Sequence, residues 1–143
     1  MFNLSVREVM SPAKGRTLAP ESTVSAAAQL MARMNIGAVL VVEHGRLVGI
    51  FTERDALYRV IARGLDPRST PVADVMTRSV RTLDPGKSYG HALVVMQENG
   101  FRHVAVIEDG VPIGIVSARN AMDPDLEEFA SEAQRRKHLR EEV

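Results

Sequence analysis

The sequence predicts an α/β (α+β) fold built from two related units whose sheets pack together about a pseudo-twofold axis, followed by a C-terminal helix. An internal repeat, a strand and helix pattern that recurs in each copy, and an ordinary globular composition predict this fold. The 143 residues are 45% hydrophobic and 25% charged, as in a domain with its own core. Each unit has the order strand, helix, strand, strand, helix, with too few strands for independent stability. Packing the two sheets together therefore buries the faces that one unit would expose.

The repeat is an internal duplication with an offset of 65 residues. GAVLVVEHGRLVGIFTERDAL at 37–57 aligns with RHVAVIEDGVPIGIVSARNAM at 102–122, and eight of these 21 pairs are identical. Upstream, Thr17-Leu18 aligns with Thr82-Leu83. We therefore assign residues 1–64 to the first repeat, 65–71 to a linker, 72–122 to the second repeat and 123–143 to a C-terminal helical tail.

The first copy opens with a short segment in which Ser5 and Glu8 have the spacing of a capping box. An extended stretch is predicted at 16–18. A helix follows the cap candidates of Pro20–Thr23, because apolar residues then recur at spacings of three and four. These apolar positions are Val24, Ala27, Leu30, Met31 and Met34.

A hairpin and a second helix complete the first copy. Val39–Val42 and Leu47–Phe51 are apolar strands on either side of a His44-Gly45 turn. The next helix is predicted to run from about Glu53 to Arg63, with Gly64 placed to end it. The predicted apolar face of this helix consists of Ala56, Leu57, Val60 and Ile61.

The second copy repeats this order but ends differently. Its first helix begins near Tyr89, and its hairpin strands are predicted at 104–107 and 112–116. Asp123 and Pro124 then start a new helix in the tail. The basic run at 135–140 is flanked by glutamates, which favours a solvated helix face over nucleic-acid binding.

The duplicated pattern resembles the tandem CBS domain pair, also called a Bateman module. The motif G-h-h-T/S-x-x-D, with h apolar, follows a hairpin in both copies, as GIFTERD at 49–55 and GIVSARN at 114–120. The resemblance covers roughly Val6 to Met122. It implies two clefts that often bind AMP, ADP, ATP, NAD or S-adenosylmethionine, and a regulatory role without a required cofactor. It also implies a homodimer that uses exposed helices as its interface and acts on a regulated protein that the sequence does not identify.

The resemblance implies which residues line each cleft, because the T/S-x-x-D segment of one unit faces the opening and central strands of the other. For the first cleft the implied residues are Thr52, Arg54, Asp55, Arg81, Thr82, Arg102 and His103. For the second cleft the implied residues are Arg16, Thr17, Gly37, Ala38, Ser117, Arg119 and Asn120. A structural dimerisation module with degenerate clefts is the alternative, and the loss of the motif aspartate in the second copy favours it.

Thr52 and Asp55 allow two compatible interpretations. Thr52 lies where a strand ends and a helix begins, so the unpaired amides of the first turn could face a phosphate. The two oxygens of Asp55 could accept hydrogen bonds from vicinal ribose hydroxyls. The other interpretation is helix capping, with Thr52 as the N-cap. Asn120 replaces the carboxylate in the second copy, so we expect unequal sites that differ by on the order of 1 kcal/mol.

Cationic residues distinguish the two predicted clefts. Arg102 and His103 begin a strand, where they suit a phosphate, although a solvated strand end is an equal alternative. Their counterparts Gly37 and Ala38 carry no charge, so the first cleft should be the more basic. Arg54 and its counterpart Arg119 lie on the first turn of a helix. Both could contact a phosphate, and the alternative that the sequence favours is an exposed arginine paired with a carboxylate.

Several functional classes are disfavoured by the sequence. The GKS of Asp84–Ser88 fails the P-loop spacing because Arg81 stands where glycine is needed, so we interpret it as a turn and helix cap. Four scattered histidines and no cysteine provide no metal-ligand spacing. Since no nucleophile, base and orienting residue come together either, we expect neither an enzyme nor a metal site.

Charge and hydropathy also limit the expected location and partners. A formal charge of zero gives no general attraction to nucleic acid or anionic membranes. No apolar run reaches the roughly 18 to 20 residues of a membrane span. Residues 1–10 contain Arg7 and Glu8 where a signal peptide would be apolar. We therefore expect a cytoplasmic protein without membrane association.

Overall fold

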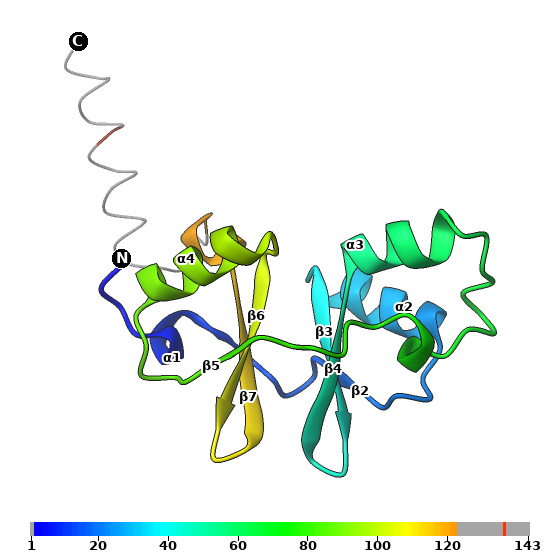
Figure 1. Cartoon of the computed structure of the whole chain (residues 1–143), viewed down its shortest axis with the longest axis horizontal. Helices are drawn as coiled ribbons and strands as arrows, with labels where there is room; N and C mark the ends of the chain where they lie inside the picture. The colour runs from blue at the N-terminus through cyan, green and yellow to red at the C-terminus, as the bar shows by residue number, and fades with distance from the viewer. Residues whose placement is uncertain (1, 123–135, 137–143) are drawn as a thin grey trace.

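Two β-hairpins lie side by side at the centre of the molecule, with the helices on their outer sides (Figure 1). The computed structural model describes residues 2–122 and residue 136. The predicted mixed fold of two repeats with packed sheets is confirmed. The predicted C-terminal helix of 123–143 lies outside the described residues, Arg136 excepted. None of the described helices is long and apolar enough to cross a membrane.

The sheet of the first repeat has three strands. β2 (Thr17–Leu18) runs parallel to β3 (Ala38–Glu43), and β3 pairs antiparallel with β4 (Arg46–Thr52). The predicted turn joins β3 to β4, with φ values of 53° at His44 and 77° at Gly45. Two successive left-handed residues match the twist of the flanking strands. The predicted hairpin is therefore confirmed.

The sheet of the second repeat has four strands in the order β1-β7-β6-β5. β5 (Thr82–Leu83) runs parallel to β6 (His103–Glu108), and β6 pairs antiparallel with β7 (Val111–Ser117). The added edge strand, β1 (Ser11–Pro12), comes from the first repeat and pairs antiparallel with β7. The start of the chain thus completes the sheet of the second repeat.

Capped helices precede both hairpins. α2 (Val24–Met34) begins at Thr23, whose hydroxyl accepts a hydrogen bond from the amide of Ala26 at 3.1 Å. α4 (Tyr89–Asn99) begins at Ser88, whose hydroxyl accepts from the amide of His91 at 3.1 Å. The GKS segment is thus the turn and cap that the sequence predicts.

The opening segments of the two repeats are exchanged in space. α1 (Val6–Val9) packs its buried valines into the core of the second repeat, beneath α4 in Figure 1. The short 3-10 helix η2 (Val72–Asp74) packs with Met76 into the core of the first repeat. The two repeats along the sequence therefore do not coincide with the two folded units. The hydrophobic core of each unit includes apolar side chains from the opening segment of the other repeat.

Two glycines make this exchange sterically possible. A Cβ on Gly49 would overlap the side chain of Met76. A Cβ on Gly114 would lie 2.5 Å from Sδ of Met10 and 2.7 Å from the carbonyl oxygen of Ser11. Since real Cβ atoms do not approach so closely, glycine at these positions lets each opening segment lie directly on the opposite sheet.

A third core joins the two sheets. It consists of small and branched side chains from the facing strands and from the segment after β1. The buried members are Ala13, Ala38, Leu40, Ile50, Ala105 and Ile115. This buried interface is the apolar area that neither sheet could cover alone.

The helix after β4 differs from the sequence prediction. Its first turn, α3 (Glu53–Asp55), continues into η1 (Ala56–Ile61), which has π-helical hydrogen bonds from residue i+5 to residue i. Val60 is buried, but Leu57 is 50% and Ile61 is 69% exposed. The prediction that these side chains share one buried face is wrong, because a wider turn rotates residues away from the 3.6-residue spacing.

Candidate functional site

Two clefts lie between the repeats. The first has a volume of about 840 Å³. It is lined by residues 52–55 and 57–59 of the first repeat, together with 77, 79–81 and 99–103 of the second. The second has a volume of about 350 Å³ and is lined by Ser117, Arg119 and Asn120 with the opening and central segments of the first repeat. Both volumes lie within the range of small-molecule sites.

The first cleft brings most of its predicted residues together. The predicted residues that line it are Thr52, Arg54, Asp55, Arg81, Arg102 and His103. Thr82 does not line the cleft but lies exposed on β5. The sequence interpretation missed Tyr58, Arg59 and Phe101, which also line it. Only Arg59 has a recognisable sequence signal, since it stands four residues after Asp55, where a helix brings opposite charges together.

Thr52 and Asp55 form a reciprocal cap at the start of α3. The amide of Thr52 donates to Oδ2 of Asp55 at 3.0 Å, and the amide of Asp55 donates to Oγ1 of Thr52 at 3.1 Å. Asp55 is 8% exposed, so the cap is largely shielded from water. The capping interpretation of these two residues is confirmed.

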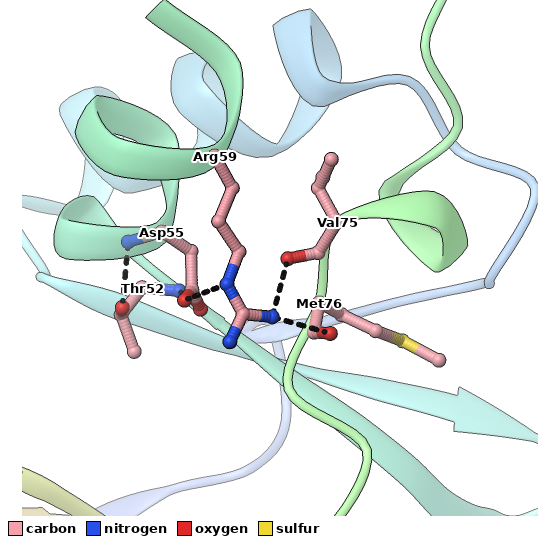
Figure 2. A network of polar contacts seen from close by, with 5 residues as sticks. All are labelled: Thr52, Asp55, Arg59, Val75 and Met76. Carbon is pink, nitrogen blue, oxygen red and sulfur yellow. Dashed lines mark hydrogen bonds and ion pairs between the residues drawn. The ribbon is translucent and has the colours of Figure 1, made fainter. Parts of the chain in front are cut away.

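Arg59 extends this cap to the second repeat, as Figure 2 shows. Its Nε lies 3.6 Å from Oδ1 of Asp55, in an ion pair one helical turn apart. Its Nη1 donates to the carbonyl oxygens of Val75 at 3.3 Å and Met76 at 3.1 Å. The guanidinium thus ties the helix start of one repeat to the opening segment of the other.

Three other arginines of the first cleft are open to a ligand. Arg54 stacks over the ring of Tyr58, with its Cζ 5.2 Å from the ring centroid, and does not make the carboxylate pair that the sequence favoured. The side chains of Arg81 and Arg102 are exposed and make no hydrogen bond or ion pair within the described part of the chain. A phosphate could therefore bind these cations without first breaking a protein ion pair.

The second cleft also contains most of its predicted residues. Those that line it are Arg16, Gly37, Ala38, Ser117, Arg119 and Asn120, whereas Thr17 is exposed on β2 outside it. Asn120 keeps the capping role of its counterpart, because its Oδ1 accepts from the amide of Ser117 at 2.6 Å. The buried Nε of Arg16 has no hydrogen-bond partner among the described residues.

The two clefts are more similar in net charge than the sequence suggests. Within the described residues, four arginines and two carboxylates line the first cleft, while two arginines and no carboxylate line the second. The first cleft has more arginines, but Glu53 and Asp55 offset two of them. A difference in ligand binding must therefore come from volume, aromatic contacts and pairing rather than from net charge.

His103 lies at the boundary between the two clefts. Burial lowers the pKa of His103 below its usual value of 6.5, and the nearby Arg119 and Arg102 lower it further, while Glu53 opposes them. A Cβ on Gly37 would lie 3.1 Å from Nε2 of His103 and 3.0 Å from Oε1 of Glu53. The absence of a side chain at Gly37 thus leaves space for the imidazole at this junction. No cluster of three or more metal-ligating side chains occurs within 2–122 and 136.

Comparisons with known proteins agree with this architecture. The CBS domain family matches residues 6–62 and 72–124. A CBS domain-containing protein of Bacillus subtilis, YhcV, is 34% identical over 113 residues, which are 79% of this chain and 79% of that protein. The mitochondrial CBS domain-containing protein CBSX3 of Arabidopsis thaliana is 37% identical over 120 residues, 80% of this chain but only 58% of that protein.

A solved structure shows the same arrangement. The crystal structure of an uncharacterized conserved protein from Pyrococcus horikoshii superimposes with a TM-score of 0.79 at 28% identity. The superposition covers 89% of this chain and 96% of the other. Together with the sequence matches, it extends the similarity across both repeats.

Proposed function

The chain belongs to the CBS domain family, whose tandem members are typically regulatory, and from this premise we propose that its first cleft binds an adenine nucleotide. One observation carries the proposal: the cleft combines unpaired arginines with an aromatic and apolar wall between the two repeats. ATP, ADP and AMP are the proposed ligands, and NAD and S-adenosylmethionine are the competitors to be tested beside them.

The phosphate end of the ligand is proposed to bind between the repeats. Arg81 and Arg102 come from the second repeat and Arg54 from the first, so their guanidinium groups surround the same space. Each has N–H donors suited to phosphate oxygens. A nucleotide held in this way would contact both repeats at once.

The nucleoside end is proposed to lie against the wall of η1. Tyr58 and Leu57 are 55% and 50% exposed yet line the cleft, so they offer a partly hydrated apolar surface to a base. Stacking on an aromatic ring contributes about 1 to 3 kcal/mol per base. Asp55 uses one oxygen for Thr52 and one for Arg59, but each carboxylate oxygen has a second lone pair for a ribose hydroxyl.

Regulation would follow from the position of the ligand. Because the cleft is lined by both repeats, a nucleotide that fits one relative arrangement of them shifts the population toward it. A partner protein would read this change. We also propose a cytoplasmic location, for which a chain without cysteine is suited.

Calorimetric titration tests the proposal. ATP, ADP, AMP, NAD and S-adenosylmethionine are titrated into the wild type, Arg102→Gln and, as a matched control, Arg46→Gln, which removes an exposed arginine outside both clefts. We expect saturable binding of at least one adenine nucleotide, weakened about tenfold or more by Arg102→Gln because a charged hydrogen bond is lost, and unchanged in the control. Failure of all five ligands to bind would refute the proposal.

A homodimer is a second proposed property, supported by exposed apolar side chains at the end of η1 and just after it. Ile61 is 69% and Leu65 is 40% exposed, and neither lines a cleft. Where such side chains form a contiguous apolar patch, they mark contacts between chains. If the dimer exists with clefts that bind nothing, the chain is a structural dimerisation module. Sedimentation of the wild type and Ile61→Lys, with and without ATP, distinguishes a dimer from a monomer.

A further inference from the structure

His103 is the one residue that lines both clefts within the described part of the chain. It begins β6, opposite Ser117 on β7, so its backbone is fixed by the central hairpin. Its counterpart in the duplication is Ala38, which has no side chain that could do the same from the first repeat. The duplicated fold therefore has a single imidazole at the junction of two sites.

We infer that His103 is a shared contact for anionic ligands and takes up one proton when a phosphate group occupies either cleft, thereby coupling the occupancy of the two clefts. The identity of the ligand as an adenine nucleotide rests on the function proposed above. The inference about His103 concerns its phosphate groups alone, and inorganic pyrophosphate supplies the same chemistry without adenosine.

The charges around His103 explain why a ligand should change its protonation. Glu53 on α3, Arg119 on η3 (Ala118–Met122) and the adjoining Arg102 are the charged groups that face it. Burial and the two arginines favour the neutral imidazole, and Glu53 only partly opposes them. A phosphate beside these groups adds negative charge, which favours the imidazolium. The protonated ring then donates a charge-assisted hydrogen bond to the anion.

Coupling follows because the two clefts share this one proton. A phosphate in the first cleft binds with proton uptake, so a second phosphate in the other cleft meets an imidazole that is already charged. Uptake should therefore approach one proton per chain, not one per ligand. By reciprocity, protonation strengthens anion binding in each cleft by the same factor that binding strengthens protonation.

Two measurements test the inference on the full chain. The first follows the imidazole resonances of His103 by nuclear magnetic resonance from pH 5 to 8, alone and with saturating ATP or inorganic pyrophosphate. The exposed His91 in α4 lines neither cleft and serves as the internal control. The second is calorimetry of the same ligands at pH 7 in buffers of different ionisation enthalpy, with wild type, His103→Gln and His91→Gln.

The expected result is a raised pKa of His103 in the complexes, with that of His91 unmoved. Proton uptake should be present in the wild type and in His91→Gln and should be reduced in His103→Gln. As the pH rises from the pKa of His103 in the free protein to its pKa in the complex, the wild-type affinity for the ligand should fall by up to about tenfold per pH unit. The phosphate group of the ligand also ionises near pH 6. Its contribution to the proton uptake should be the same in all three proteins, so it cancels when the variants are compared with the wild type.

The outcomes separate this inference from the proposed function. Nucleotide binding with an unmoved His103 pKa would overturn the inference and leave the proposed function standing. A pKa raised by pyrophosphate without any binding of adenine nucleotides would support the inference and refute the nucleotide proposal. Uptake of one proton per ligand when two ligands bind would contradict the shared role of His103. If neither ligand binds, both proposals fail.

Discussion

The two repeats share one hydrogen bond at the helix start but connect it differently to the rest of the molecule. In the first repeat, Asp55 caps α3 and also pairs with Arg59, which holds the carbonyls of Val75 and Met76. In the second, Oδ1 of Asn120 accepts from both the amide and the hydroxyl of Ser117, and the position aligned with Arg59 is Pro124. Local hydrogen bonds thus preserve the duplicated backbone, while the contacts between the repeats have diverged.

The largest difference in stability is expected between alanine variants of Gly49 and Gly114, the two glycines on which the opening segments lie. Gly114→Ala should lower the free energy of unfolding by about 2 to 3 kcal/mol, because the new methyl group meets the backbone oxygen of Ser11 as well as Met10. Gly49→Ala should cost about 1 kcal/mol, since it meets only the flexible side chain of Met76.

Urea unfolding of both variants measures this difference. Val94→Ala on the exposed surface of α4 is the control, with an expected change below about 0.5 kcal/mol. Equal losses at the two glycines would show that the contact with Ser11 does not distinguish the repeats.

An intermediate effect is expected when the motif residues are interchanged. Asp55→Asn keeps an oxygen for the amide of Thr52 but loses the charge that pairs with Arg59. It should destabilise the chain by about 1 kcal/mol. Asn120→Asp should change stability by less than about 0.5 kcal/mol, because no arginine stands four residues after it.

Thermal unfolding of the two single variants and the double variant measures these changes. Among the described residues, no hydrogen bond or ion pair joins Asp55 to Asn120, so their effects should add. A loss from Asn120→Asp as large as that from Asp55→Asn would contradict the proposed importance of the Arg59 pair.

The smallest effect is a pH dependence of stability at His103. Its folded pKa lies below the usual 6.5, so the unfolded chain binds more protons than the folded chain below that pH. Stability contributed by the neutral ring is present above pH 6.5 and is lost as the pH falls below it, with a slope under the ~1.4 kcal/mol per pH unit of a full proton difference. Urea unfolding between pH 5 and 8 should give a flatter profile for His103→Gln than for His91→Gln. An identical profile in both variants would argue against a lowered pKa in the folded state.

Local patterns predicted the elements whose hydrogen bonds lie within a few residues. The His44-Gly45 turn, the Ser88 cap and the Thr52 cap each depend on neighbouring residues, so the sequence contains the necessary information. The apolar face of the helix after β4 was mispredicted, because the spacing of Leu57 and Ile61 does not show that this segment forms a wider π-helical turn. Most of the residues that the family resemblance implied do line the clefts, while the contribution of Tyr58, which has no sequence signal, required the folded arrangement.

The amino-acid sequence alone determined that this protein is a duplication of a mixed α+β unit, because apolar spacing, caps and turns act over short distances along the chain. Only the tertiary structure decided that the opening segments change places, that Arg59 bridges the repeats and that His103 borders both clefts. These features join residues far apart in sequence. They depend on how two sheets bury their apolar faces against each other, which no local pattern specifies.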